Sequence, residues 1–407
     1  MSELELALSR TLQAFPAAIP RRAATALAIL DRVRAGSMEV VLPDSRCMTL
    51  GRGPRAARMR VSDWRAFDIA LDKGDIGLAE AYIDGRWETD DLPGLLTLLA
   101  KSRDALQDAV YGNALRLVGY RLSHLLRANT RDGARRNIMA HYDLGNRFYE
   151  SWLDSTMSYS AALFEADGTR SFEDAQLAKY RRILDRLDAN PRQQVLEIGC
   201  GWGGFAEYAV KEVGARVTGI TISTEQFDFA TRRMAEQGLS ERAEIKLIDY
   251  RDIEGTFDRV ASIEMFEAVG ERYWPTYFNK IQEVLAPGGR AALQIITIQE
   301  ALFEGYRKRA DFIQKYIFPG GMLPSESRLK AETDRAGLIW TGVSRFGQDY
   351  AETLAQWEQR FDARWDDIKG PDFDEHFRKI WRFYLSYCDA GFRTGRTDVV
   401  QLGLAKA

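Results

Sequence analysis

The sequence predicts an α/β protein: a parallel sheet with helices on both faces, and a smaller N-terminal domain that is mostly helical or α+β. The stretch Gln194–Phe205 reads as a short buried strand, a cluster of glycines and the start of a helix. Strands and helices then alternate to about Ile298, which is typical of a parallel sheet. Upstream of about residue 130 this alternation is absent. We therefore expect an accessory domain over residues 1–130 and a main domain over residues 131–407.

Length and composition limit the function classes. The 407 residues are enough for two domains, and a hydrophobic fraction of 45% suffices for a real core. A net charge of -3 gives no reason to expect nucleic-acid binding. Three widely spaced cysteines and three scattered histidines show no metal-ligand pattern. We therefore expect no metal site and a reduced, cytoplasmic protein.

No segment of the sequence predicts insertion into a membrane. The first five residues lack the basic start and apolar core of a signal peptide. No apolar run approaches the roughly 20 residues that a spanning helix needs. If the substrate is a lipid, the protein must therefore reach it from the membrane surface.

The first 130 residues predict short elements and no catalytic constellation. Ala and Leu at helical spacing predict a helix from about Leu4 to Leu30, and Gly85–Glu88 reads as a turn. The other expected elements are strands at 38–42 and 47–50 and helices at about 64–72, 78–82 and 92–99.

A basic amphipathic stretch, residues 111–127, closes this domain, and three further arginines follow it across the domain junction. Two interpretations are open. The stretch is either a helix that docks on the core with its basic face in water, or a helix that contacts anionic lipid headgroups.

Aromatic side chains are dense among polar ones between Ile138 and Phe164. This composition predicts a lid over an apolar pocket with a few polar anchors. A purely structural aromatic cluster is the alternative.

The βα alternation places three carboxylates where ligands bind. In a parallel sheet, ligands lie at the carboxyl ends of the strands. Glu197, Asp249 and Glu264 fall at or near such ends. The expected strands are 194–198, 216–223, 244–250, 257–264, 291–298 and 338–343, with residues 401–404 ending the sheet. The expected helices are 224–237, 273–285 and long helices through residue 388, with turn formers at 318–325.

The spacing Glu197-x-Gly199-x-Gly201-x-Gly203 resembles the S-adenosylmethionine site of class I methyltransferases more than a dinucleotide fingerprint. A diphosphate needs an open helix N-terminus. S-adenosylmethionine has no phosphate, so a carboxylate near its sulfonium and amino group is acceptable. The alternative is a tight strand-to-helix turn in an ordinary α/β protein.

Six motifs, in order, resemble those of the cyclopropane-fatty-acyl-phospholipid synthases. They are HYDLGNRFYESWLDSTMSYS, VLEIGCGWGGFAEYA, GITISTEQ, MFEAVG, FPGGMLPS and DYAETLAQW. The resemblance is strong from about Ile138 to the C-terminus and looser before it. It implies a class I methyltransferase (Rossmann-like) fold. It also implies S-adenosylmethionine-dependent C-methylation at the cis double bond of an acyl chain in a membrane phospholipid.

The resemblance also implies which residues bind the cofactor. Gln226 can hydrogen-bond a ribose hydroxyl, and Tyr250 can stack on the adenine face. The full set is Tyr159, Ser160, Glu197, Gly199, Gly201, Thr221, Ser223, Gln226, Asp249 and Tyr250.

In the family a bound bicarbonate, held by a Cys, a Glu, a His, a Tyr and backbone, is thought to remove the proton. Glu267 and Tyr350 match the Glu and the Tyr, but Ala161 replaces the Cys and Gln294 replaces the His. We therefore expect the bicarbonate site to be rebuilt or abolished, and bicarbonate as a cofactor is doubtful. The catalytic candidates are Glu267, Tyr350, Glu264, Gln294 and His141, the last from the first motif.

Glu264 stands where the family commonly has glycine, three positions before Glu267. Two nearby carboxylates could stabilise a carbocation, and one could act as a base. The alternative is a strand-end carboxylate and a helix N-cap partner without a catalytic role.

The position from which the proton leaves decides the product. Loss from the new methyl group with ring closure gives a cyclopropane, whereas loss without closure gives a methyl-branched alkene or an exomethylene. We predict the uncyclised, methyl-branched product, with cyclopropane synthesis as the first alternative. A methyltransferase for a soluble small molecule and a non-catalytic lipid-binding protein are the alternatives from other classes.

The resemblance finally implies partners. We expect an unsaturated membrane phospholipid as substrate and peripheral contact with the inner face of the membrane. The N-terminal domain would contact lipid or form a homodimer. A reductase would act on an uncyclised product.

Overall fold

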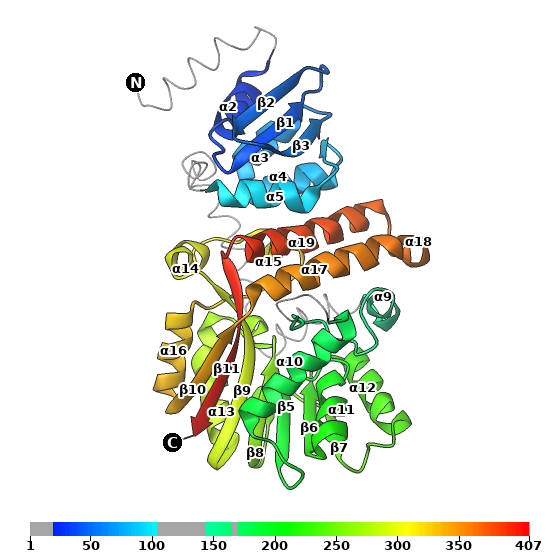
Figure 1. The fold of residues 1–407 in the computed structure, drawn as a ribbon, viewed down its shortest axis with the longest axis vertical. Helices are drawn as coiled ribbons and strands as arrows, with labels where there is room; N and C mark the ends of the chain where they lie inside the picture. The colour runs from blue at the N-terminus through cyan, green and yellow to red at the C-terminus, as the bar shows by residue number, and fades with distance from the viewer. Residues whose placement is uncertain (1–18, 104–143, 165–169, 407) are drawn as a thin grey trace. The chain divides into compact units, whose positions relative to one another are not determined.

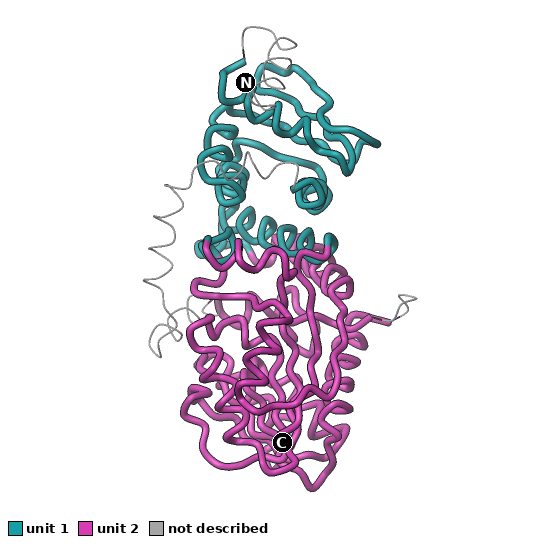
Figure 2. Tube along the Cα trace, turned by 90° about the vertical axis from the view of Figure 1, so that its left-hand side faces the viewer, with its two compact units in different colours: residues 1–123, 309–316, 369–394 teal, residues 124–308, 317–368, 395–407 magenta. Residues whose placement is uncertain are grey.

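The chain forms two compact units (Figure 2). The computed structural model describes residues 19–103, 144–164 and 170–406. Unit 1 comprises residues 1–123, 309–316 and 369–394, and unit 2 comprises residues 124–308, 317–368 and 395–407. The predicted domain boundary near residue 130, the start of the first predicted helix, the basic stretch and His141 lie outside the described residues. They stay predictions.

Unit 1 contains a four-stranded sheet of order β2-β1-β3-β4. Its strands are β1 (Gly36–Val41), β2 (Cys47–Arg52), β3 (Arg55–Val61) and β4 (Trp87–Glu88). Its helices are α2 (Arg21–Leu30), α3 (Arg65–Lys73), α4 (Asp75–Ile83), α5 (Leu92–Lys101), α15 (Phe312–Tyr316) and α19 (Glu375–Arg393). The sequence analysis missed β3, although its arginines alternate with buried apolar residues as in a half-buried strand. The predicted turn at 85–88 is a turn at Gly85 followed by β4.

Unit 2 is built on a seven-stranded sheet of order β10-β11-β9-β8-β5-β6-β7 (Figure 1). The strands are β5 (Gln194–Ile198), β6 (Arg216–Thr221), β7 (Ala243–Leu247), β8 (Phe257–Ile263), β9 (Leu285–Ile298), β10 (Leu338–Arg345) and β11 (Thr397–Lys406). The five strands from β9 to β7 in this order run parallel to one another. The last strand departs from the predicted parallel sheet: β11 is longer than expected, lies inside the sheet and runs antiparallel to both neighbours.

Helices cover both faces of this sheet. They are α9 (Asn146–Glu150), α10 (Phe172–Leu187), α11 (Gly204–Val213), α12 (Thr224–Glu236), α13 (Trp274–Val284), α14 (Glu300–Tyr306), α16 (Glu326–Arg335), α17 (Gly347–Ala363) and α18 (Trp365–Ile368). Three 3₁₀ turns are η1 (Tyr250–Asp252), η2 (Phe266–Ala268) and η3 (Glu271–Tyr273). In β5, Val195 packs with α10 and α11, whereas Leu196 packs with α13, because successive strand side chains point to opposite faces.

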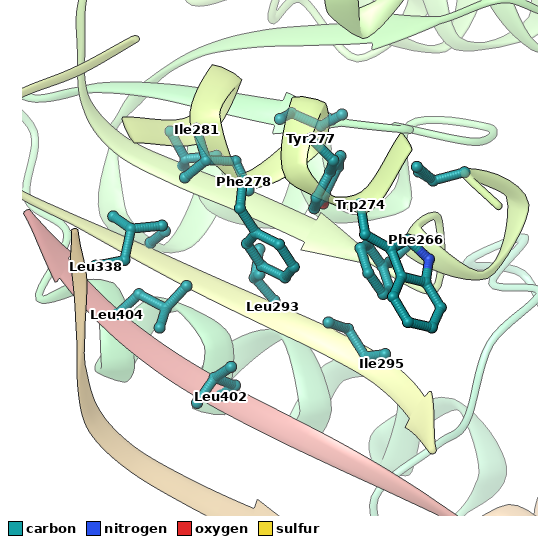
Figure 3. Packing of buried hydrophobic residues seen from close by; sticks show 14 of the residues in the cluster. Phe266, Trp274, Tyr277, Phe278, Ile281, Leu293, Ile295, Leu338, Leu402 and Leu404 are labelled. Atoms are coloured by element: carbon teal, nitrogen blue, oxygen red, sulfur yellow. The ribbon is translucent and has the colours of Figure 1, made fainter. Parts of the chain in front are cut away.

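The face of the sheet that α13 covers is lined by buried aromatic and aliphatic side chains. Figure 3 shows Trp274, Tyr277 and Phe278 of α13 packed over Leu293 of β9 and Leu402 of β11. All are nearly or fully buried, and burial of each such side chain is worth ~1.5–3 kcal/mol. This face therefore stabilises the packing of α13 on β9 and β11.

The opposite face of the same strands carries polar side chains. Gln294 of β9 and Gln401 of β11 are register partners, and both are fully buried. Their strand neighbours belong to the hydrophobic cluster under α13, so the two glutamines point to the other face, toward α10. A buried polar pair in the centre of a sheet must be hydrogen-bonded. Its partners lead to the candidate site.

Candidate active site

The glycine turn after β5 presents backbone at the carboxyl end of the sheet. Gly199 has φ +81°, and a Cβ there would lie 2.7 Å from the Cγ of Met265. Gly201 has φ +51°, and a Cβ there would meet nothing within 4 Å. The turn therefore needs glycine for its backbone at both positions, while Gly201 borders open space that a ligand can enter.

Glu197 is a buried carboxylate with an unused oxygen. It lies in β5 and is 2% exposed, and its Oε2 has no hydrogen-bond partner among the described residues. Burial raises the pKa of this carboxyl well above its usual range, although the charge of Lys179 opposes the shift. A buried acceptor without a partner fits a cationic ligand beside the glycine turn, as expected for S-adenosylmethionine.

The end of β6 forms a second part of the predicted cofactor site. Ser223 caps α12, because its Oγ accepts a hydrogen bond from the backbone N–H of Gln226 at 3.3 Å. The hydroxyl of Thr221 donates to Oε1 of Gln226 at 2.8 Å. Since that oxygen is engaged, Gln226 can offer its NH2 group to a ligand hydroxyl.

The two predicted residues after β7 have different surroundings. The Asp249 carboxylate accepts from the backbone and guanidinium of Arg251, at 2.6 to 2.9 Å. Tyr250 is half-buried and packs edge-on against Tyr277, with ring centroids 5.5 Å apart. Burial raises the pKa of Tyr250 to about 12, so its phenol stays neutral. Asp249 thus shapes the loop, and Tyr250 is the residue that offers a ring.

Most of the predicted aromatic lid lies in the core. Phe148, Tyr149 and Trp152 are at most 3% exposed, which agrees with the structural alternative for these three residues. Tyr159 is partly exposed and contacts Tyr149, Trp152 and Trp357, with ring centroids 5.2 to 5.6 Å apart. Tyr159 is therefore held rigidly at the border of this aromatic cluster.

Glu264 is the centre of the predicted catalytic group. Its Oε1 accepts hydrogen bonds from the backbone N–H of Ala161 at 2.9 Å and from Nε2 of Gln294 at 2.7 Å. Its Oε2 accepts from the hydroxyl of Tyr350 at 2.6 Å. The structure thus brings together position 161, Gln294 and Tyr350, and all three donate to one carboxylate.

Glu267 lies three residues further on, in η2. Its Oε1 accepts from the backbone N–H of Ile296 at 2.5 Å. Its Oε2 is shielded from solvent and has no hydrogen-bond partner in the described part of the chain. Burial, with the nearby charge of Glu264 as the second cause, raises the pKa of Glu267 to about 8. A carboxyl with a free oxygen and a pKa near neutrality is suited to proton transfer.

The sequence analysis missed two residues of this network. Gln401 donates to Oε1 of Gln294 at 3.0 Å and to the backbone carbonyl of Lys179 at 3.2 Å. Lys179 itself is 0% exposed. A signal for Lys179 was present, because it follows Ala175 by four residues and precedes Ile183 by four, on the apolar face of α10. Gln401 had no such signal, since its partner is more than a hundred residues away.

Residues 129–402 match the family described as mycolic acid cyclopropane synthetase. Tuberculostearic acid methyltransferase UfaA1 of Mycobacterium tuberculosis is 40% identical over 340 residues, or 82% of this chain and 79% of the relative. Cyclopropane-fatty-acyl-phospholipid synthase of Escherichia coli is 35% identical over 350 residues, or 84% of this chain and 86% of the relative.

Solved structures show the same similarity. Cyclopropane synthase MmaA2 from Mycobacterium tuberculosis has a TM-score of 0.62 and 28% identity, and covers 67% of this chain and 98% of its own. Mycolic acid cyclopropane synthase CmaA1, complexed with SAH and CTAB, has a TM-score of 0.61, 28% identity and the same coverage.

Proposed function

This chain belongs to the mycolic acid cyclopropane synthetase family, as its motifs predicted, and we propose that within this family it makes a methyl-branched, uncyclised acyl chain. The enzyme is an S-adenosylmethionine-dependent methyltransferase of fatty acyl chains with a class I methyltransferase fold. Its substrate would be the cis double bond of an acyl chain in a membrane phospholipid. The protein would meet that lipid at the membrane surface. Among the described residues, no helix is long and apolar enough to cross a bilayer.

One observation carries the proposal: Glu264 holds the hydrogen bonds of the predicted bicarbonate site. The donors at positions 161, 294 and 350 converge on its carboxylate. On this proposal, a tethered carboxylate would take the place of the family's diffusible anion. A relative with 40% identity that is named a methyltransferase, rather than a synthase of cyclopropanes, supports the same product.

The cofactor site fits S-adenosylmethionine, which supplies an electrophilic methyl group when bound. Glu197 would face its positive charge, the turn at Gly199 and Gly201 would let it approach the backbone, and the NH2 of Gln226 would bind a ribose hydroxyl. Burial of Glu197 strengthens the attraction because the local dielectric is low.

Methylation of an alkene first creates positive charge on the acyl chain. With the cofactor bound, the π electrons would form the new carbon–carbon bond to its methyl group, the S–C bonding pair would remain on the released S-adenosylhomocysteine, and the other alkene carbon would become a cation. Burial raises the pKa of Glu264 above its ordinary value, while Lys179 and the hydrogen bonds from Tyr350, Ala161 and Gln294 favour the ionised form. In that ionised form Glu264 would stabilise the cation.

Proton loss then fixes the product. The Oε2 of Glu267 would take a proton from a chain carbon next to the cation, and the C–H electrons would form a new double bond. Loss from the new methyl group would give an exomethylene only after a 1,2-hydride shift has moved the cation to the carbon that bears this methyl group. A reductase that supplies two electrons and two protons would convert this alkene into a saturated methyl-branched chain. The second candidate is ring closure to a cyclopropane, which the 35% identity to the Escherichia coli synthase favours.

The test is the fatty-acid profile of a host that contains cis-monounsaturated phospholipid, with and without the protein. Gas chromatography with mass spectrometry should show an acyl chain heavier by one methylene. Nuclear magnetic resonance should show vinylic protons, which catalytic hydrogenation removes to leave a saturated methyl branch. Cyclopropane signals without an alkene would refute the uncyclised product. Glu197→Ala is the matched inactive control.

A further inference from the structure

One peptide group connects helix α10 to the carboxylate of Glu264. The backbone N–H of Ala161 donates to Glu264, and the carbonyl of the same peptide belongs to Ser160. That carbonyl accepts from Nε2 of Gln176 at 3.1 Å and from Nζ of Lys179 at 3.4 Å. A trans peptide is planar, so two donors that orient its C=O also orient its N–H in the opposite direction.

Lys179 holds the adjoining hydroxyl as well. Its ammonium donates to Oγ of Ser160 and lies 5.0 Å from the ring centroid of Tyr180. The side chain is completely buried, and no carboxylate among the described residues lies within ion-pair distance of it. Its charge is therefore not cancelled by a direct partner.

Three carboxylates face this ammonium at longer range. They come from three places in unit 2: Glu264 after β8, Asp154 after α9 and Glu197 in β5. Burial lowers the pKa of Lys179 to about 8, and all three carboxylates oppose that shift. By reciprocity, the ammonium favours the ionised form of each carboxylate.

We propose that Lys179, together with Gln176, is a positioning residue of the methyl transfer. The pair fixes the Ser160–Ala161 peptide so that its N–H points at Glu264. The Lys179 ammonium also keeps Glu264 anionic opposite the cation that forms on the acyl chain. This inference rests on the proposed role of Glu264 and adds a geometric and an electrostatic element to it.

The two elements have different consequences. Loss of Gln176 removes an orienting hydrogen bond and no charge. Loss of Lys179 removes an orienting hydrogen bond and the positive charge, so Glu264, Asp154 and Glu197 hold their protons to higher pH. The hydrogen bonds from Lys179 to the Ser160 carbonyl and from the Ala161 N–H to Glu264 polarise one another, which further favours the ionised form of Glu264.

The test compares Lys179→Met and Gln176→Leu with the wild-type enzyme on vesicles of cis-monounsaturated phospholipid. The measurements are kcat against pH, the KM for S-adenosylmethionine and binding of S-adenosylhomocysteine by calorimetry. We expect kcat to fall roughly 10–100-fold in both variants. The acid limb of the kcat profile should move up by about 1 pH unit in Lys179→Met only. Lys330→Met, an exposed lysine paired with Asp334 on α16, should behave as wild type.

The possible outcomes separate this inference from the proposed function. A wild-type enzyme that gives no methylated lipid refutes the proposed function. A wild-type enzyme that is active, with a folded Lys179→Met variant of unchanged kcat and acid limb, refutes the positioning role alone. If Lys179→Met does not fold, Lys179→Gln keeps a donor to Ser160 and removes the charge. Its acid limb must then move upward, and an unmoved limb refutes the electrostatic role.

Discussion

At the scale of single residues, Glu264 combines a left-handed backbone with a carboxylate that has three donors. Its φ is +51°, a conformation that costs a non-glycine residue ~1–3 kcal/mol unless its surroundings enforce it. The hydrogen bonds from Ala161, Gln294 and Tyr350 provide that enforcement. Glycine would adopt the same backbone without strain, so the Glu264 side chain is present despite the free-energy cost of a positive φ.

Glu264→Gly removes the carboxylate and leaves its three donors without an acceptor. We expect the variant to keep its fold, because glycine accepts the positive φ, and to lose most of its activity in buffer free of small anions. Formate or bicarbonate should restore a measurable part of the rate, because either can enter the vacated space and accept the same hydrogen bonds. The measurement is S-adenosylhomocysteine release with unsaturated vesicles. Glu264→Gln is the control, since its amide fills the space; rescue of both variants would contradict the idea.

Glu267→Gln tests the raised pKa of Glu267. In the folded protein this carboxyl has a pKa of about 8 and keeps its proton to that pH, whereas the unfolded chain loses it near the ordinary pKa of 4.5. Between these values the unfolded state binds fewer protons, so the free energy of unfolding falls as the pH rises. Glutamine does not titrate. The stability of the wild type relative to Glu267→Gln should therefore decrease over this window, by up to ~5 kcal/mol in urea titrations. Parallel stability curves would show that the pKa is not raised.

At the scale of elements, the sequence predicted the βα framework closely and missed what long-range pairing decides. Strong hydrophobic patterns and glycine turns mark β5, β6 and β8, and the structure has them within a few residues of the predicted bounds. The strand β11 was only partly recognised, because its length and interior position depend on β9 and β10. Local pattern cannot report such pairing.

The candidate site divides in the same way. Motif positions predicted Glu264, Gln294 and Tyr350 as members of one site, and the structure brings them together. The sequence did not predict that Gln294 and Tyr350 would donate hydrogen bonds to Glu264. It also gave no role to Lys179 or Gln401, because their contacts connect a helix and a strand that are 222 residues apart in the chain.

Gly199→Ala tests the turn after β5. Alanine at this position would have to adopt a positive φ, and its Cβ would lie 2.7 Å from the Cγ of Met265. Gly214→Ala is a matched control, since Gly214 has φ +70° but its Cβ would meet only Pro191 at 3.6 Å. Both variants should lose ~1–2 kcal/mol from the backbone conformation. Gly199→Ala should lose a further ~1–3 kcal/mol from overpacking and should weaken S-adenosylhomocysteine binding. Equal effects in urea unfolding and calorimetry would mean that the packing against Met265 is unimportant.

At the scale of the whole molecule, the two units are interleaved along the chain. Unit 1 includes α15 and α19, which lie far beyond the sequence that the N-terminal prediction covered. The cofactor candidates all belong to unit 2. Ligand binding should therefore stabilise unit 2 directly.

Differential scanning calorimetry with S-adenosylhomocysteine checks this. At a ligand concentration of 100 times Kd, the transition that contains unit 2 should gain ~2.7 kcal/mol and move to higher temperature. Glu197→Ala should lose most of that gain, because its buried carboxylate is the acceptor proposed for the ligand's charge. Glu326→Ala, on the exposed pair with Arg345, should keep it. An undiminished shift in Glu197→Ala would exclude Glu197 from the ligand site.

The position of β11 has a consequence for synthesis on the ribosome. Translation delivers the chain from the N-terminus, so β11 emerges after β9 and β10, yet it belongs between them. Until it inserts, β10 has no strand to pair with, and one edge of β9 is open. A nascent chain that pauses before residue 397 therefore exposes two unpaired strand edges at once. Completion of the sheet therefore needs Thr397–Lys406, and a chain paused before that segment is a natural client for a chaperone.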